Sequence, residues 1–237
     1  RRVLFRSVSW RAAFIVPGVV CVLTALVLFV LIRTGRVVAM NYLADVYPIE
    51  HDDVVLHAAP LSHGSGIVAL PTIARGAANL ILDALSFSPE LLFETVEKNR
   101  VSHIAFLAPT QIVSILEKFD PDKHDMSTVK AVCYGGAPIY LENLKAAVKA
   151  FGPIFAQIYG QGEAPITVTG LTRAMHAEFA ATDDPRLGSA GIARTDVEVR
   201  VVNDKGEAVN PGDPGEIIAR GRGHEMEANG VRQLMSI

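Results

Sequence analysis

The sequence predicts an α/β protein with a largely parallel sheet and helices, followed by a small β subdomain and preceded by one membrane-type helix. Short apolar runs alternate with helical patterns between residues 37 and 187, as in proteins whose parallel strands are joined by helices. Past Gly188 the period changes to two, which is typical of half-buried strands. One long uncharged run stands near the N-terminus. The predicted divisions are residues 1–36, 37–187, 188–223 and 224–237.

Composition sets the first limits on function. Half of the 237 residues are hydrophobic, which is enough to bury a sizeable core. Lys and Arg number 22 against 25 Asp and Glu, and a net charge of −3 provides no general basic field, so no nucleic-acid partner is expected. Cys21 and Cys133 stand far apart, without a neighbouring Cys or His at ligand spacing. Neither a disulfide framework nor a zinc site is therefore indicated.

The run from Ala12 to Ile32 contains 21 residues without a charge and is bounded by Arg11 and Arg33. At 1.5 Å per residue this is long enough to cross a hydrocarbon core of about 30 Å. A buried soluble helix and a signal peptide are the alternatives, but the run has no polar stripe and no A-x-A-like cleavage site follows it. We therefore expect a membrane-type helix here, with membrane contact through residues 12–32 if that stretch is native.

Two resemblances indicate that this end is foreign to the rest of the chain. Residues 1–7 resemble the in-frame translation of a common sequencing-adapter oligonucleotide, and no initiator Met precedes them. Residues 10–18 resemble a helix start in major facilitator transporters, whose sites lie between many helices. A transporter fragment is an alternative that rests on residues 8–35 alone, and no second apolar run near 18 residues supports it.

Local signals predict each element of the α/β region. A helical pattern over residues 37–47 stops at Pro48, because proline disrupts a helix. Ser88 and Pro89 open a helix that runs to about Asn99, as an N-cap followed by a proline at the first position. Apolar runs predict strands at residues 53–59, 79–82, 103–107, 129–134 and 153–159. The other predicted helices cover residues 66–75, 109–118 and 140–151.

The β subdomain is predicted from an alternating strand and its return. Val197, Val199 and Val201 recur at every second position, and residues 203–206 have the composition of a turn. Residues 216–220 then form the returning strand.

Four unusual loops mark where a ligand could bind. Ligands of open α/β sheets bind at the carboxyl ends of the strands, so loops that follow apolar runs are the candidates. Each loop alone is a weak signal, because Gly-Gly-Pro is usually a turn and a lone His is usually hydrogen-bonded. The Gly64-Ser65-Gly66 run lacks nucleophile-elbow spacing, so no acyl-enzyme serine is predicted. The loops are residues 57–66, 134–138, 159–165 and 188–191.

In this order and at these separations, the four loops resemble the adenylate-forming superfamily of acyl-CoA synthetases, aryl-CoA ligases, luciferases and peptide-synthetase adenylation domains. Residues 211–217 with Arg220-Gly221 add a fifth match, and the resemblance covers residues 37–223. Within the superfamily the chain is most similar to carboxylic-acid CoA ligases. The resemblance implies that a carboxylate and ATP form an acyl-adenylate and pyrophosphate, and that CoA then takes the acyl group as a thioester.

The resemblance also implies roles for individual residues. Gly135, Gly136, Ala137 and Pro138 would lie along the adenine. Tyr159 would stack on adenine or border the acyl site, while Gly160, Gln161 and Gly162 would shape the nucleotide pocket. His63 would line the channel between the acyl group and the nucleotide, and Glu163 would hold Mg²⁺ at the phosphates. His63 and Glu163 are thus the expected catalytic residues.

For the parent enzyme the resemblance implies ATP or AMP, Mg²⁺ and CoA as cofactors. A small-molecule carboxylate or fatty acid would be the other partner, and the location would be cytoplasmic. A membrane-associated protein is expected instead if residues 12–32 are native.

Three departures from the family pattern bear on activity. Gly162 stands where the family usually has Thr before the Glu, so phosphate contact there would fall to backbone N–H groups. Only Thr34-Gly35-Arg36 echoes the family's phosphate loop, and residues 222–237 do not continue toward its ribose-binding Asp and catalytic Lys. We therefore expect the polypeptide itself to be inactive or nearly so. The alternative hypothesis is a membrane-anchored, non-catalytic module that binds a nucleotide or an acyl group.

Overall fold

The structure, a computed structural model, describes residues 46–84, 86–161, 164, 166, 168–195, 197–221, 224 and 225. The chain divides into two compact units, residues 1–38 and 39–237, and everything described here belongs to the second. The membrane-type run at residues 12–32 lies outside the described residues. Of the helix predicted over residues 37–47, only the last two residues are described. Among the described helices, none is long and apolar enough to cross a membrane.

A seven-stranded sheet organises the α/β region in the order β2-β1-β3-β4-β5-β6-β7. The first five strands in this order are mutually parallel, whereas β6 and β7 each pair antiparallel with their neighbours. The predicted largely parallel sheet is therefore confirmed. The strands are β1 (Val54–His57), β2 (Ala78–Ile81), β3 (His103–Leu107), β4 (Ala131–Gly135), β5 (Phe155–Tyr159), β6 (Thr169–Leu171) and β7 (Ile192–Ala193).

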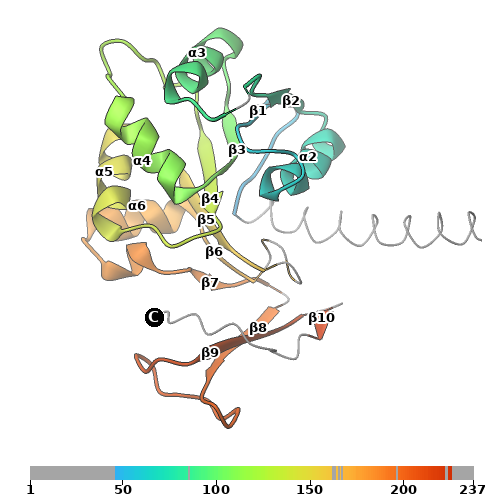
Figure 1. Ribbon diagram of the computed structural model, residues 1–237, viewed down its shortest axis with the longest axis vertical. Helices are drawn as coiled ribbons and strands as arrows, with labels where there is room; N and C mark the ends of the chain where they lie inside the picture. The colour runs from blue at the N-terminus through green and yellow to red at the C-terminus, as the bar shows by residue number, and fades with distance from the viewer. Residues whose placement is uncertain are drawn as a thin grey trace, which may run out of the picture. The chain divides into compact units, whose positions relative to one another are not determined.

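Helices cover the two faces of this sheet unequally (Figure 1). One buried cluster joins the sheet to α3 (Pro89–Asn99), α4 (Pro109–Lys118), α5 (Leu141–Phe151) and α6 (Arg173–Ala181). The second cluster lies on the other face, where Val68 of α2 (Gly64–Arg75) joins Val55, Ala105 and Ala156 of the strands. Because both faces are covered, β3 and β4 are buried along their whole length, as parallel strands usually are.

Local chemistry explains where the helices begin. The Ser88 hydroxyl accepts a hydrogen bond from the Leu91 N–H, and Pro89 occupies the first turn of α3. At the start of α4, the Gln111 side-chain oxygen accepts from the Ala108 N–H at 2.8 Å. The predicted boundaries of α3, α4 and β3 are confirmed.

Several elements differ from the sequence prediction. The strand expected at residues 79–82 lies one residue earlier, at Ala78–Ile81, and α2 begins at Gly64 rather than at residue 66. Strands β6 and β7 and helix α6 were not predicted at all. Their strands have only three and two residues, which is too short for a hydrophobic period to be detected. Thr172 caps the start of α6, where its hydroxyl accepts a hydrogen bond from the Met175 N–H at 3.2 Å. A threonine is a common N-cap residue, and it was the sequence signal that could have indicated this helix.

A β-bulge interrupts β3 near its carboxyl end. Ile104 pairs with Val132 and Leu107 pairs with Tyr134, so three steps along β3 match two along β4. The extra residue breaks the alternation of side chains, and Ala105 and Phe106 both belong to the cluster on the α2 face. The bulge thus moves the Phe106 ring out of the layer that contains Ile104 and Leu107.

The predicted β subdomain is present as a second, antiparallel sheet in the order β10-β9-β8. Val197 pairs with Gly221 and Val202 with Glu216, which gives the hairpin its register. Gly206, with φ of 79°, lies in the connecting turn. The strands are β8 (Val197–Val202), β9 (Glu216–Gly221) and β10 (His224–Glu225), and a short 3-10 helix, η1 (Pro185–Gly188), precedes β7.

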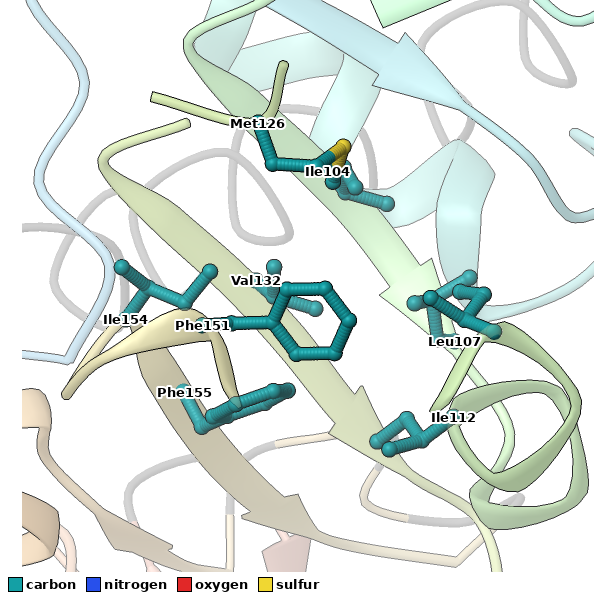
Figure 2. Close-up of a pocket in the computed structure, with 9 residues that line it drawn as sticks. Ile104, Leu107, Ile112, Met126, Val132, Phe151, Ile154 and Phe155 are labelled. Carbon is teal, nitrogen blue, oxygen red and sulfur yellow. The ribbon is translucent and has the colours of Figure 1, made fainter. Parts of the chain in front are cut away.

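A small apolar cavity of about 10 Å³ lies within the larger cluster (Figure 2). Figure 2 shows side chains of β3, β4, β5 and α4 around it, with the Phe151 ring among them. Room for about one water molecule and the lack of polar partners make this a packing defect rather than a ligand site. Its lining residues are Ile104, Leu107, Ile112, Ile115, Met126, Val132, Phe151, Ile154 and Phe155.

Candidate functional site

The strand order places a topological switch point between β1 and β3. From β1 the chain continues to β2 on one side, whereas from β3 it continues to β4 on the other. Open α/β sheets bind ligands in the crevice at the carboxyl ends of such strands. The predicted His63 loop leaves this edge from β1, and the predicted Gly135 loop leaves the same carboxyl edge of the sheet from β4, the neighbour of β3.

Phe106 links the first two of these loops. The His63 ring lies 5.8 Å from the Phe106 ring, centroid to centroid. A Cβ atom added at Gly64 would lie 3.4 Å from the Phe106 ring, and one added at Gly136 would also lie 3.4 Å from it. The bulge in β3 therefore brings one aromatic ring against both loops. His63 itself is exposed, while Phe106 is buried.

The loop after β4 requires its two glycines for different reasons. Gly136 has φ of 80°, a conformation that L side chains rarely adopt. Gly135 packs against the neighbouring strand, and a Cβ there would lie 2.4 Å from the Ile158 carbonyl oxygen. Gly136, Ala137 and Pro138 are exposed, so the loop presents backbone to a ligand at the sheet edge.

Tyr159 ends the adjacent strand at the same edge. Gly135 pairs with Ile158, which puts Tyr159 next to the glycine loop. Tyr159 is half-buried, and its hydroxyl accepts a hydrogen bond from Nε2 of Gln161 at 3.0 Å. Gly160 lies so close to the following turn that a Cβ would approach the Ile166 backbone nitrogen to 2.3 Å. These contacts hold Tyr159 and Gln161 together beside the exposed backbone of residues 136–138.

The structure thus assembles most of the predicted site residues along one edge. His63 lies against Phe106, Phe106 touches the Gly136 position, and Gly135 pairs beside Tyr159. The predicted site residues Gly162 and Glu163 lie outside the described residues. Within the described part of the chain, no group of three or more His, Cys, Asp or Glu side chains could hold a metal ion.

The fourth predicted loop lies elsewhere along the sheet. Gly170 pairs with Ile192 and Thr169 with Ala193, so Gly191 precedes β7 and lies against the Gly170 and Leu171 backbone. Thr169 pairs with both Tyr159 and Ala193. The end of β7, rather than the glycine segment before it, therefore lies at the same edge of the sheet as Tyr159. The glycine segment therefore provides close backbone packing within the sheet rather than a loop at the carboxyl edge.

A buried hydrogen bond supports the glycine loop from behind. The Tyr134 hydroxyl lies 3.0 Å from Nε2 of His176, and Nδ1 of His176 lies 2.8 Å from the Thr172 carbonyl oxygen. A carbonyl can only accept, so Nδ1 carries the proton and Nε2 accepts from Tyr134. Burial lowers the pKa of His176 to about 4, against an opposing effect of its backbone hydrogen bond, and it raises the pKa of Tyr134. Both groups are therefore neutral near pH 7.

Three contributors to this edge were missed from the sequence. Phe106 is one of several apolar residues in a buried run, and only its bulge distinguishes it. His176 lies in a helix that was not predicted. His57 was included only as part of its loop, although its ring bonds Ser65 and Asn79. None of the three has a sequence signal that identifies its partner.

Comparison with known proteins identifies the family. Residues 29–226 match the family described as AMP-binding enzyme. The chain belongs to this AMP-binding enzyme family. The resemblance to the adenylate-forming superfamily is thereby confirmed.

Curated members of the AMP-binding family are similar to this chain over most of its length. It is 32% identical over 166 residues to medium/long-chain-fatty-acid–CoA ligase FadD8 of Mycobacterium tuberculosis, a match that covers 70% of this chain and 28% of the relative. It is 34% identical over 172 residues to a feruloyl-CoA synthase of an Amycolatopsis species, covering 72% of this chain and 33% of that one. The chain thus spans about a third of the length of these relatives.

Solved structures of the family agree with the fold. The amide bond synthetase McbA of Marinactinospora thermotolerans matches with a TM-score of 0.70 and 28% identity, over 79% of this chain and 36% of that chain. The o-succinylbenzoate coenzyme A synthetase MenE of Bacillus subtilis, in a structure with AMP, matches with a TM-score of 0.62 and 25% identity. That match covers 77% of this chain and 35% of MenE.

Proposed function

We propose that this chain contributes the adenine-binding edge of an AMP-forming acyl-CoA ligase. The observation that carries the proposal is the convergence of the exposed Gly136–Pro138 loop with half-buried Tyr159 at the carboxyl ends of two adjacent parallel strands. Exposed glycine backbone beside an aromatic ring suits a flat base, because backbone can approach closely and the ring can stack. The family of the relatives supports the same function.

The proposed roles are those that the family resemblance implies, and the positions of the described residues support them. Gly135 to Pro138 would lie along the adenine, Tyr159 would stack on it or border the acyl group, and Gly160 and Gln161 would shape the pocket around Tyr159. His63, beside Phe106, would line the channel between nucleotide and acyl group. Gly162 and Glu163 complete the proposed set, with Glu163 as the Mg²⁺ ligand, since a hard cation favours carboxylate oxygen.

The substrate class is a small-molecule carboxylate. When bound, Mg²⁺ would offset the charge on the phosphates as a carboxylate attacks ATP, and CoA would then accept the acyl group. Similar proteins are named for a fatty acid, ferulate, indoleacetate and 4-coumarate, which have a carboxylate in common but differ in the rest of the molecule. We propose the carboxylate, and a panel of aliphatic and aromatic acids would define the rest.

Calorimetric titration with AMP tests the nucleotide site directly. Ala137→Glu places a negative charge on the proposed adenine loop, whereas Ala78→Glu places the same charge on another exposed alanine, in β2. We expect the first substitution to weaken AMP binding about tenfold or more, as repulsion and blocked access would require, and the second to leave it unchanged. Equal affinity in all three proteins, or no binding by the wild type at millimolar AMP, would contradict the proposal.

We further propose that these 237 residues alone turn over slowly or not at all. The support is the sequence itself, in which Thr34-Gly35-Arg36 is the only echo of a phosphate loop. Charge placed opposite the transferring phosphorus supplies much of the stabilisation in such reactions. Pyrophosphate exchange with the acid panel measures this, and robust exchange by the purified chain would contradict it.

A further inference from the structure

Three side chains form a continuous hydrogen-bonded chain at the base of the His63 loop. Nδ1 of His57 lies 2.8 Å from the Ser65 hydroxyl, and Nε2 of His57 lies 2.6 Å from Oδ1 of Asn79. His57 ends β1, Ser65 lies in the first turn of α2, and Asn79 belongs to β2. The three residues therefore connect two neighbouring strands to the helix that follows the loop.

The donors and acceptors of this chain have one arrangement that satisfies them all. The Oδ1 atom of Asn79 can only accept, so Nε2 of His57 carries the proton. Nδ1 then has a lone pair, which accepts from the Ser65 hydroxyl. Burial lowers the pKa of His57, although the hydrogen bond that its ring donates to Asn79 and a backbone hydrogen bond with Ser65 oppose this, so the neutral ring that the arrangement needs is favoured.

A Ser-His-Asn chain suggests a nucleophile, but burial excludes that role. Ser65 and His57 are 0% and 1% exposed. Nucleophilic attack needs a substrate atom within about 3 Å of the hydroxyl oxygen, and nothing can approach a hydroxyl that has no accessible surface. The hydroxyl serves as a donor to His57 instead.

The hydrogen bond between His57 and Ser65 joins the two ends of a loop. Residues 58–64 connect His57 to Ser65, and within this loop the His63 N–H donates to the Pro60 carbonyl at 3.0 Å. The Gly66 N–H in turn donates to the His63 carbonyl at 3.0 Å. Both backbone groups of His63 are thus fixed in a tight turn, while its side chain is exposed beside Phe106.

We propose that His57 is a positioning residue, which anchors Ser65 and so holds the 58–64 loop in the conformation that presents His63 beside Phe106. The geometry of the loop carries this inference, and its consequence for ligands rests on the function proposed above. In that setting, a loosened loop would spread the His63 side chain over several positions and weaken its contact with the acyl group.

Five substitutions separate positioning from general stability. Ser65→Ala and His57→Leu each remove the bond between strand and helix, whereas His57→Gln keeps one acceptor and one donor on the side chain. Thr72→Ala is the matched control, because Thr72 is also 0% exposed and lies in the same helix, but its hydroxyl donates only to the Val68 carbonyl at 2.7 Å. Asn79→Ala removes the outer bond at an exposed position and provides a variant that should fold if the others do not.

The first measurement is native-state hydrogen exchange of the His63 and Gly66 amides relative to amides of β4. Loss of one hydrogen bond should speed exchange at these two amides about tenfold in Ser65→Ala and His57→Leu, and less in Asn79→Ala. His57→Gln and Thr72→Ala should leave the ratio to β4 within about twofold. An unchanged ratio in Ser65→Ala, His57→Leu and Asn79→Ala would overturn the proposal, and so would a ratio that Thr72→Ala raises equally.

The second measurement is the affinity for an acyl-sulfamoyl adenosine, a stable mimic of an acyl-adenylate. Ser65→Ala should weaken its binding severalfold and His57→Gln should restore most of the affinity, while AMP binding changes little. If the wild type fails to bind this probe, the proposed function fails and the exchange measurement still tests the anchor. If the probe binds and Ser65→Ala leaves its affinity intact, the positioning role is overturned.

Discussion

The Tyr134 hydroxyl donates a hydrogen bond to Nε2 of His176 at 3.0 Å, and both side chains are buried. Tyr134 directly precedes the glycine loop at the end of β4, while His176 lies in α6, so the bond joins the sheet to a helix behind the candidate site. The same two rings pack edge to face, with centroids 5.7 Å apart.

Tyr134→Phe should destabilise the protein, because it keeps the ring and leaves the buried Nε2 atom without a donor. We expect a loss of about 1–3 kcal/mol in the free energy of unfolding, as for other buried polar atoms left unpaired. Urea denaturation at pH 7 measures it. Tyr140→Phe is the control, since Tyr140 is 83% exposed and its hydroxyl should contribute almost nothing. Equal effects of the two substitutions would mean that the buried bond is energetically silent.

Stability should fall as the pH is lowered from about 6.5 toward 4. The pKa of His176 is lowered by burial from 6.5 to about 4, so in this range the unfolded chain binds a proton that the folded chain does not. The stabilisation is complete above the unfolded pKa and is lost as the pH falls, with a slope on the order of 1 kcal/mol per pH unit. Burial also lowers the pKa of His57 and of His103, which adds to the same slope.

Urea midpoints between pH 7.5 and 4.5 would measure this slope. His176→Gln retains a polar side chain but cannot titrate, so its slope should be shallower than that of the wild type by part of one proton. Parallel curves for the two proteins would assign the pH dependence to the other buried histidines.

Asp53→Asn should cost stability at neutral pH and little in acid. The Asp53 carboxylate is 2% exposed and accepts from Nζ of Lys130 at 2.7 Å and from the Glu50 N–H at 2.8 Å. Burial alone would raise the pKa of Asp53, but these bonds, the charge on His103 and the Ser102 hydroxyl together lower it. Its stabilisation is therefore present above the ordinary carboxyl pKa and is lost as the pH falls through the lowered one.

The measurement is the difference in unfolding free energy between wild type and variant at pH 7 and pH 3. About 1–3 kcal/mol is expected at pH 7, with a clearly smaller difference at pH 3. Asp122→Asn, at an exposed position, provides the control. A difference that stays constant with pH would show that the charge on Asp53 is not the stabilising feature.

Ile104→Ala should be severely destabilising because it enlarges an existing void. Ile104 is 1% exposed and lines the apolar cavity in Figure 2. Removing its side chain from a core typically costs about 2–5 kcal/mol. Ile73→Ala changes the same residue type at a position that is 65% exposed, where about 0.5 kcal/mol or less is expected. Thermal and urea unfolding of the pair would test whether this cluster is the main source of stability.

Much of the sheet could be predicted because its strands are buried on both faces and its helices carry explicit caps. The boundaries of β3, α3 and α4 follow from apolar runs, Ser88, and prolines at helix starts. By contrast, β6 and β7 form through pairing with β5 and each other, and three residues contain too little pattern to reveal that. The strand prediction at residues 79–82 was one residue late because β2 is exposed along most of its length and so lacks a burial pattern.

The candidate site also contains residues that the sequence could predict and residues that it could not. The Gly135 and Tyr159 loops were predictable because glycine next to an aromatic at a strand end is visible in the sequence, and the register of β4 and β5 brings them together. Tertiary contacts decide the rest. No local pattern reveals that His57 reaches Ser65 and Asn79, or that His176 reaches Tyr134 across 42 positions.

The extra residue in β3 gives position 106 an unusual independence. In a regular strand, a change of size at this point would disturb the layer that packs α3 to α6, since alternate side chains share a face. Here Phe106 sits with the α2 cluster, while its neighbour Leu107 belongs to the other layer. A protein with this kink can exchange one aromatic ring for a smaller or larger group beside the proposed site while the main core keeps its packing. Deleting Ala105 would remove the bulge and restore regular alternation, with Phe106 still on the α2 face between Ile104 and Leu107.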